Sequence, residues 1–81
     1  MEDEIIEILV REILAESLTL NLNGVTLDAR LVDDLEAGSL ELIEALMNVE
    51  EEFSIEISDE EVEEIVTVSD LISIVKEKKD G

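Results

Sequence analysis

The 81-residue chain contains no cysteine, histidine, tryptophan, tyrosine or proline. Without cysteine it can form no disulfide, thiolate metal site or sulfur nucleophile, which suits a reducing cytosol. Without histidine it lacks the usual general base near neutral pH. Phe53 is the single aromatic residue, so a platform for stacking nucleic-acid bases is also missing. We therefore expect no self-contained catalysis, and any thiol chemistry would require a prosthetic group.

Basic residues are scarce: 5 Lys and Arg stand against 24 Asp and Glu, which gives a formal charge of −19, and none lies between Leu31 and Val75. Such a chain should repel nucleic acids and anionic bilayers and attract basic protein surfaces. Hydrophobic residues nevertheless make up 46% of the chain, enough to support a folded core. With no long apolar run and an acidic start, we expect a soluble, cytoplasmic monomer with one domain over residues 1–81.

Aliphatic residues recur at helical spacing in four segments, which predicts amphipathic helices over residues 1–17, 40–53, 58–65 and from Thr67 toward the C-terminus. The third is short and begins with the capping-box spacing of Ser58 and Glu61. The predicted fold is therefore all-α, a small four-helix bundle of three longer helices and one short helix, with a long first loop.

Within that loop, Leu18–Leu27 alternates between apolar and polar residues around Asn23-Gly24. This pattern is typical of a β-hairpin with a type I′ turn. An isolated hairpin is marginally stable, so we favour an ordered loop that packs a few aliphatic residues onto the bundle.

Ser39 follows a small-residue turn, Ala37-Gly38, and precedes a strongly acidic amphipathic helix. Glycine permits a sharp turn, and serine is a favoured helix N-cap because its Oγ can accept a first-turn N–H. A phosphate esterified to this hydroxyl would lie beside the positive end of the helix dipole. The pattern thus allows two interpretations, a structural cap or an attachment site for a phosphate-linked group.

Several short motifs occur in the order and spacing of acyl carrier proteins, and the chain resembles that family. They are Asp34-Leu35, Gly38-Ser39-Leu40, Glu44, Met47, Glu50-Glu51-Glu52-Phe53, Ile57 and Asp59-Glu60-Glu61. The resemblance implies that Ser39 carries a 4′-phosphopantetheine arm, attached by a phosphopantetheinyl transferase. The thiol of the arm would hold an acyl group as a thioester for fatty-acid, polyketide or specialised acyl metabolism. The protein would be a carrier and not an enzyme.

Two residues beside Ser39 depart from the resembled family, and both affect recognition by the transferase. Glu36 stands where the family usually has glycine, and Gly38 stands where it usually has aspartate. Related peptidyl carriers often have a small or glycine-rich turn before the serine, so Gly38 is compatible with modification. Which transferase accepts this sequence stays open.

The resemblance also implies a docking surface and an interior for the acyl chain. The docking surface would contact basic surfaces of the transferase and of acyl-processing enzymes through Gly38, Leu40, Ile43, Glu44, Met47, Glu50, Glu51 and Ile57. The acyl chain would enter between helices lined by Val49, Ile57, Ile65 and Ile72. A dry, packed core is the alternative for the same four residues.

Two other functions compete with the carrier. The first alternative is an unmodified acidic helical adaptor that binds a basic protein partner, and the other is an acidic metal buffer. We expect no specific metal site, because Asp28, Asp33 and Asp34 lack the order of a calcium-binding loop.

Charge crowding has a further consequence for the runs Glu50–Glu52 and Asp59–Glu61. Like charges held close together favour protonation, so we expect these carboxylates to have pKa values above the usual value of about 4. The folded state should then gain stability as the pH falls from 7 toward about 5, and salt should stabilise it by screening.

Overall fold

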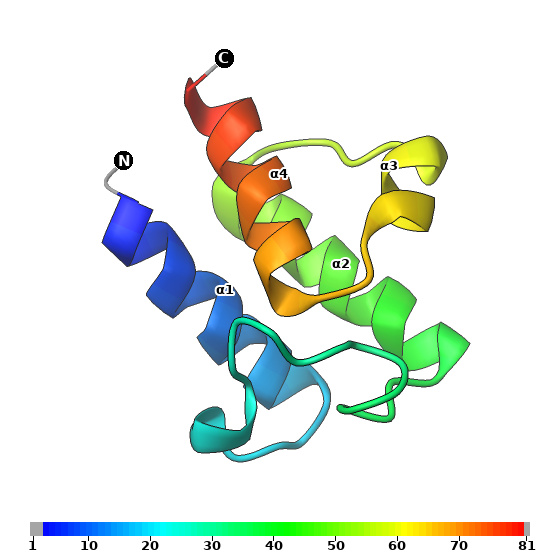
Figure 1. Cartoon of the computed structure of the whole chain (residues 1–81). Helices are drawn as coiled ribbons and strands as arrows, with labels where there is room; N and C mark the ends of the chain where they lie inside the picture. The colour runs from blue at the N-terminus through cyan, green and yellow to red at the C-terminus, as the bar shows by residue number, and fades with distance from the viewer. Residues whose placement is uncertain (1–2, 81) are drawn as a thin grey trace.

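The computed structural model describes residues 3–80 and contains four α-helices and one 3₁₀ turn (Figure 1). The helices are α1 (Asp3–Ser17), α2 (Ser39–Phe53), α3 (Asp59–Glu64) and α4 (Val68–Asp80), and the 3₁₀ turn is Leu22–Gly24. The described residues form no strand, only an isolated antiparallel bridge between Arg30 and Thr67. The predicted all-α bundle with one short helix is confirmed; Met1 and Glu2, assigned to the first helix, lie outside the described residues.

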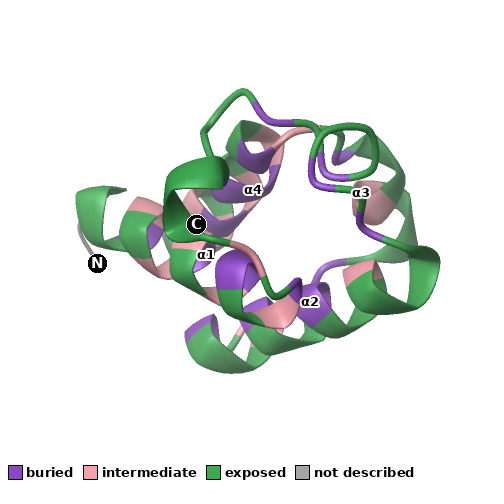
Figure 2. Cartoon of the chain, turned by 90° about the horizontal axis from the view of Figure 1, so that it is seen from below, coloured by how far each residue is buried: buried purple, intermediate pink, exposed green. Residues whose placement is uncertain are grey.

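Each of the three longer helices buries one apolar stripe. Residues three or four positions apart share a helix face, so one side of each helix faces the others. In α1 the stripe packs against both α2 and α4, as the purple inward faces in Figure 2 show. The buried residues of the described chain are all apolar, and include Ile6, Val10 and Leu14 in α1, Val49 and Phe53 in α2, and Leu71 and Val75 in α4.

The first loop is ordered without forming a hairpin. Its 3₁₀ turn is capped by the Asn21 side chain, which accepts the N–H of Asn23 at 3.1 Å. Neither Asn23 nor Gly24 has the positive φ that a type I′ turn requires. Arg11 of α1 instead fastens the loop by donating from Nε to the Val25 carbonyl at 2.7 Å. The hairpin alternative is therefore wrong, and the favoured ordered loop is confirmed.

The second half of this loop is held by backbone hydrogen bonds to the connection between α3 and α4. Leu31 donates to the Val66 carbonyl at 2.9 Å, and Val68 donates to the Ala29 carbonyl at 3.0 Å. The buried Leu31 side chain adds an apolar anchor. These contacts join two segments far apart in sequence and fix the path by which the chain reaches α2.

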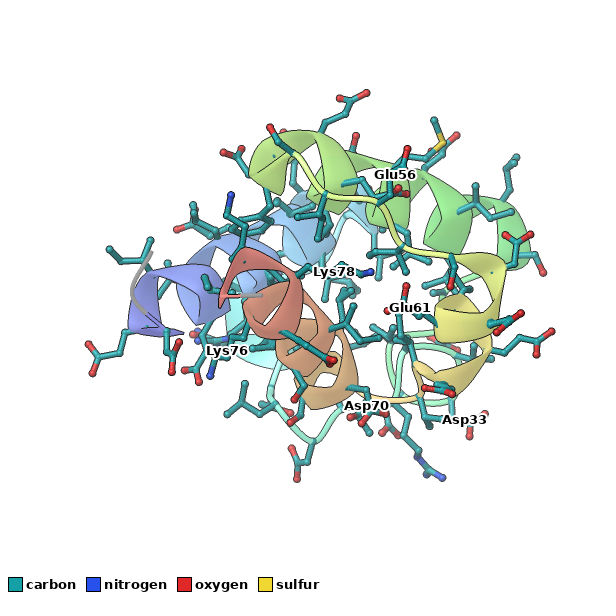
Figure 3. The ribbon with its side chains drawn as sticks, turned by 90° about the horizontal axis from the view of Figure 1, so that it is seen from above. Asp33, Glu56, Glu61, Asp70, Lys76 and Lys78 are labelled. Carbon is teal, nitrogen blue, oxygen red and sulfur yellow. The ribbon has the colours of Figure 1, made fainter. Side chains whose placement is uncertain are left out.

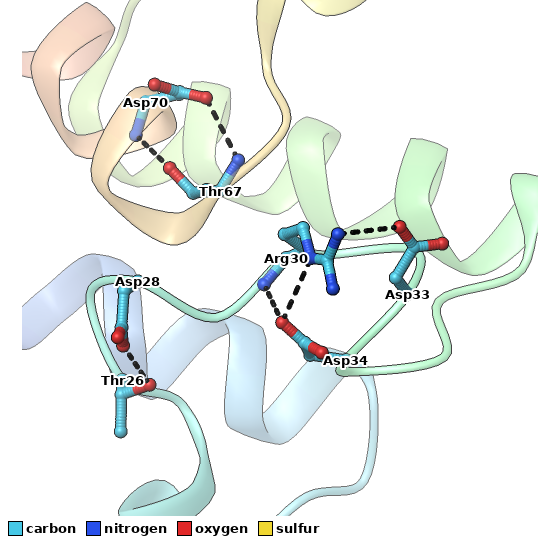
Figure 4. Close-up of polar contacts among 7 residues, drawn as sticks. All are labelled: Thr26, Asp28, Arg30, Asp33, Asp34, Thr67 and Asp70. Carbon is cyan, nitrogen blue, oxygen red and sulfur yellow. Dashed lines mark hydrogen bonds and ion pairs between the residues drawn. The ribbon is translucent and has the colours of Figure 1, made fainter.

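Two aspartates hold turns by accepting backbone N–H groups (Figure 4). The Asp34 carboxylate accepts the N–H of Arg30 at 2.8 Å, and this bond, together with the nearby guanidinium, lowers the pKa of Asp34. At the start of α4, the Asp70 carboxylate accepts the N–H groups of Thr67 at 3.0 Å and Val66 at 2.9 Å, which lowers the pKa of Asp70. Thr67 Oγ1 in turn accepts the Asp70 N–H at 3.1 Å, completing a reciprocal cap.

Glu61 differs from the expectation for its acidic run. The Lys78 ammonium hydrogen-bonds its carboxylate at 2.9 Å, and the Ser58 N–H adds a second bond, so the pKa of Glu61 is lowered. The expected upward shift is therefore wrong at this residue, because folding brings a cation from another helix that neighbours in sequence do not reveal.

Because the pKa values of Asp34, Glu61 and Asp70 are lowered in the fold, the folded state should lose stability at acidic pH. A carboxylate with a folded-state pKa below its unfolded value of about 4 stabilises the fold above that value, and the stabilisation is lost as the pH falls through the folded-state pKa. We predict that urea midpoints fall between about pH 4 and pH 2.5. Asp70→Asn should lower the midpoint at pH 7 and make this acid-side fall smaller.

The control for this prediction is Glu12→Gln, which removes one charge from an exposed position on α1. It should leave the size of the acid-side fall unchanged. A fall of the same size in Asp70→Asn and in the unsubstituted protein would contradict the assignment of this stability to the α4 cap. The stabilisation by relief of charge repulsion that the sequence predicts would act nearer pH 5 to 7, so the two effects can be separated.

Candidate functional site

Ser39 is the first residue of α2, and Gly38 is the N-cap, with φ −72° and ψ 164°. The first hydrogen bond of the helix runs from the Leu42 N–H to the Gly38 carbonyl at 2.8 Å. The interpretation of Ser39 as the N-cap is therefore wrong, because the helix begins one residue earlier than that interpretation requires. Ser39 is exposed, and the described residues give its Oγ no hydrogen-bond partner. Its hydroxyl is thus available for chemistry.

The backbone before Ser39 is held at Ala37, which is buried and donates its N–H to the Leu31 carbonyl at 3.0 Å. Glu36, one residue earlier, has φ 54° in the left-handed region. A residue with a Cβ is strained there, whereas glycine adopts this conformation readily. This explains why the resembled family usually has glycine at the position of Glu36.

Gly38 has no comparable backbone requirement, because its φ of −72° is accessible to any residue. A Cβ built at this position would lie 3.3 Å from Oε1 of Glu41, which is the movable end of a flexible side chain. An aspartate at position 38 would therefore be accommodated after a small shift of Glu41. The departure at Gly38 changes the charge beside Ser39 and leaves the path of the chain unaltered.

The residues around Ser39 fit a phosphate-linked arm. The amides of Ser39, Leu40 and Glu41 precede the first helical hydrogen bond and are not capped by a side chain. Such N–H groups, together with the helix dipole, favour an anion at this end of the helix. A phosphodiester on the exposed Ser39 oxygen would be stabilised without a basic side chain. When bound, a phosphopantetheine arm would supply a thiol that this chain lacks.

The predicted docking residues divide into two groups. Most lie on the outer side of α2 or at its start, where Leu40, Ile43 and Met47 are 71%, 53% and 53% exposed. Gly38, Glu44 and Glu51 are exposed beside them. The remaining two are Glu50, which is partly buried and accepts the Ile57 N–H at 3.2 Å, and Ile57, which is buried and offers little surface.

The four candidate lining residues, Val49, Ile57, Ile65 and Ile72, are all buried in the apolar core. Two surface hollows lie nearby, and of these four residues Ile57 alone lines either of them. The larger, of about 580 Å³, lies between α1 and α2 and includes Ile13 and Asn48. The smaller, of about 370 Å³, includes Ile57 and lies beside α3. The core is packed, so an acyl chain would need the helices to part.

The described residues form neither a membrane-spanning helix nor a metal-binding cluster. No described helix combines the length and apolar character needed to cross a bilayer. Within residues 3–80, His, Cys, Asp and Glu side chains do not gather in threes at a distance suited to a metal ion.

Comparison with known proteins identifies the class of this domain. The family described as the phosphopantetheine attachment site matches residues 9–75, which defines a carrier domain of that class. The chain is 44% identical over 77 residues to the acyl carrier protein of Petrotoga mobilis, covering 95% of this chain and 89% of the relative. It is 47% identical over 70 residues to that of Solidesulfovibrio magneticus, covering 86% and 90%.

A solved structure, that of the acyl carrier protein from Enterococcus faecalis, has the same fold. It superposes with a TM-score of 0.79 at 31% identity, over 96% of this chain and 99% of that one. The chain belongs to the acyl carrier protein family. Its members are carriers and not enzymes, and their prosthetic group is 4′-phosphopantetheine.

The strained backbone at Glu36 gives a testable prediction. Glu36→Gly should raise the free energy of unfolding by up to about 1 kcal/mol, because glycine removes the strain at φ 54°. Glu36→Ala removes the same charge and keeps the Cβ, so it should give a smaller gain or none. Chemical denaturation of the three proteins measures the difference. Equal gains in both variants would show that charge, and not backbone strain, is the cause.

Proposed function

We propose that Ser39 is the attachment site for the 4′-phosphopantetheine arm and that the chain acts as a single carrier domain. The observation that supports this most directly is the exposed, unbonded hydroxyl of Ser39 at the start of α2. The thiol of the arm would hold an acyl group as a thioester, as in fatty-acid biosynthesis, and deliver it to acyl-processing enzymes. The protein supplies attachment, orientation and protection, and the arm supplies the reactive sulfur.

We propose the outer side of α2 as the surface that partner enzymes contact. Leu40, Ile43 and Met47 would form its apolar centre, while Glu44 and Glu51 would form its acidic rim. Each of the five basic side chains makes a hydrogen bond or ion pair within the fold, through Arg11, Arg30, Lys76, Lys78 and Lys79. This acidic rim therefore keeps its negative charge for basic partner surfaces, including that of the transferase.

The buried set of Val49, Ile57, Ile65 and Ile72 is our proposed path for the acyl chain. Each of these side chains is aliphatic, and no polar or charged residue of the described chain is buried among them. Opening would cost packing contacts and, where Ile57 moves, the part-buried hydrogen bond from its N–H to Glu50. We further propose that the carrier works as a monomer in the cytosol.

Modification of Ser39 can be tested directly. Incubation with coenzyme A and a broad-specificity phosphopantetheinyl transferase should add one arm to the chain, detected by intact mass. Ser39→Ala should abolish the addition, whereas Ser73→Ala, which removes an exposed serine of α4, should leave it unchanged. Failure of the unsubstituted chain with several transferases, including the one from its own source, would favour an unmodified acidic adaptor.

Docking through α2 predicts a position-dependent effect of charge. Glu44→Lys or Glu51→Lys should slow association with a partner enzyme roughly threefold or more at low salt, and the effect should shrink as salt is raised. Glu12→Lys makes the same charge change at an exposed position of α1 and should have a smaller effect. Stopped-flow association rates measure the comparison. Equal slowing by all three substitutions would show that only total charge matters.

A further inference from the structure

α3 is held in the fold differently from the three longer helices. None of its residues is buried, and Val62 packs against the core only partly. The apolar anchors lie just outside it, at Ile57 before the helix and Ile65 after it. Burial is the main stabilising contribution in the rest of the bundle. Polar contacts therefore have a larger share in keeping α3 in place.

The principal polar contact of α3 with another helix is made by Glu61. Its Oε1 accepts from Lys78 Nζ of α4 at 2.9 Å, and also from the Ser58 N–H at 3.0 Å and Ser58 Oγ at 3.1 Å. The two side chains point toward each other across the space between α3 and α4 (Figure 3). One carboxylate oxygen thus joins the cap of the short helix to the last turn of α4.

Both members of this ion pair line the smaller surface hollow. The hollow, of about 370 Å³, is lined by Glu50, Glu56, Ile57, Ser58, Glu61 and Lys78. Its apolar lining residue, Ile57, also belongs to the buried core. A second contact lies in the lining of the same hollow, where Glu50 of α2 accepts a hydrogen bond from the Ile57 N–H. The segment from Ile57 to Glu61 is therefore held by one polar contact from α2 and one from α4.

The strength of the pair suits a contact that opens and closes. The side chains of Lys78 and Glu61 are 26% and 32% exposed, so water partly screens their attraction. Pairs of this kind shift an equilibrium roughly two- to fivefold. That is sufficient to favour the closed position of α3 and small enough to be broken when a ligand or partner stabilises the open position.

We propose that the Lys78–Glu61 pair is a latch that holds α3 closed over the apolar core and thereby controls how readily an acyl chain enters and leaves it. The latch lets α3 move while the packed stripes of α1, α2 and α4 stay in place. The role in acyl passage rests on the proposed carrier function. The existence of the latch can be tested without it.

The test compares two substitutions on the same helix. Lys78→Gln removes the latch, and Lys76→Gln removes a pair between α4 and Glu7 of α1 at 3.2 Å. Both remove one positive charge from α4. Lys78→Gln should speed hydrogen exchange of the Val62 and Ile65 amides, which bond within the α3 segment, roughly two- to fivefold. Lys76→Gln should leave these two amides unchanged.

A charge-only variant of the second partner separates the latch from the α3 cap. Glu61→Gln keeps an oxygen that can accept from Ser58 but removes the ion pair. It should speed the same amides by a similar factor, and combining it with Lys78→Gln should add little. Unchanged exchange in Lys78→Gln, or equal acceleration by Lys76→Gln, would overturn the latch.

A second measurement tests the acyl role on protein that carries an octanoyl thioester on its arm. Hydroxylamine should cleave the thioester roughly two- to fivefold faster in Lys78→Gln than in Lys76→Gln, because an open α3 exposes the chain more often. Faster amide exchange without faster cleavage would overturn control of acyl passage. If no arm can be attached at all, the proposed attachment site fails instead, and amide exchange on the unmodified chain still decides the latch.

Discussion

The fold depends on the packing of the α1 apolar stripe against α2 and α4. A chain with a formal charge of −19 repels itself when compact, and the described residues bury no polar side chain that could offset this repulsion. Ile6, Val10 and Leu14 are fully buried at this contact. Aliphatic burial must therefore supply most of the stabilisation, and the other features of the structure are arranged around that core.

Most of the few basic residues contact loops, the short helix α3 or a helix end. Arg11 fastens the first loop, Arg30 its second half, and Lys76 joins α4 to α1. Lys78 reaches α3, and Lys79 donates to the Phe53 carbonyl at the end of α2 at 3.0 Å. Because these five cations are paired with groups outside the exposed side of α2, that side keeps its negative charge. The same distribution thus stabilises the loops and leaves acidic the surface that we propose for partner docking.

The geometry around Ser39, the proposed attachment site, comes from the loop before α2. Hydrogen bonds from Leu31 to Val66 and from Ala37 to Leu31 fix the loop, and Glu36 completes the turn at a strained φ. Gly38 then becomes the N-cap, which leaves the Ser39 hydroxyl exposed. A residue whose hydroxyl is not needed to cap the helix can carry a prosthetic group without loss of helix stability.

The sequence by itself determined the helical segments, the short third helix and the position of Ser39, because periodicity and capping signals act locally. Its resemblance to acyl carrier proteins, and not the helical spacing, implied that Leu40, Ile43 and Met47 belong to a docking surface, and the structure leaves all three exposed. Only the tertiary structure decided that Asn23-Gly24 forms no hairpin, that Gly38 replaces Ser39 as the cap, and that Glu61 pairs with Lys78. Each depends on groups distant in sequence, such as Arg11, Val66 and the last turn of α4, and local pattern carries no information about which distant groups folding brings together.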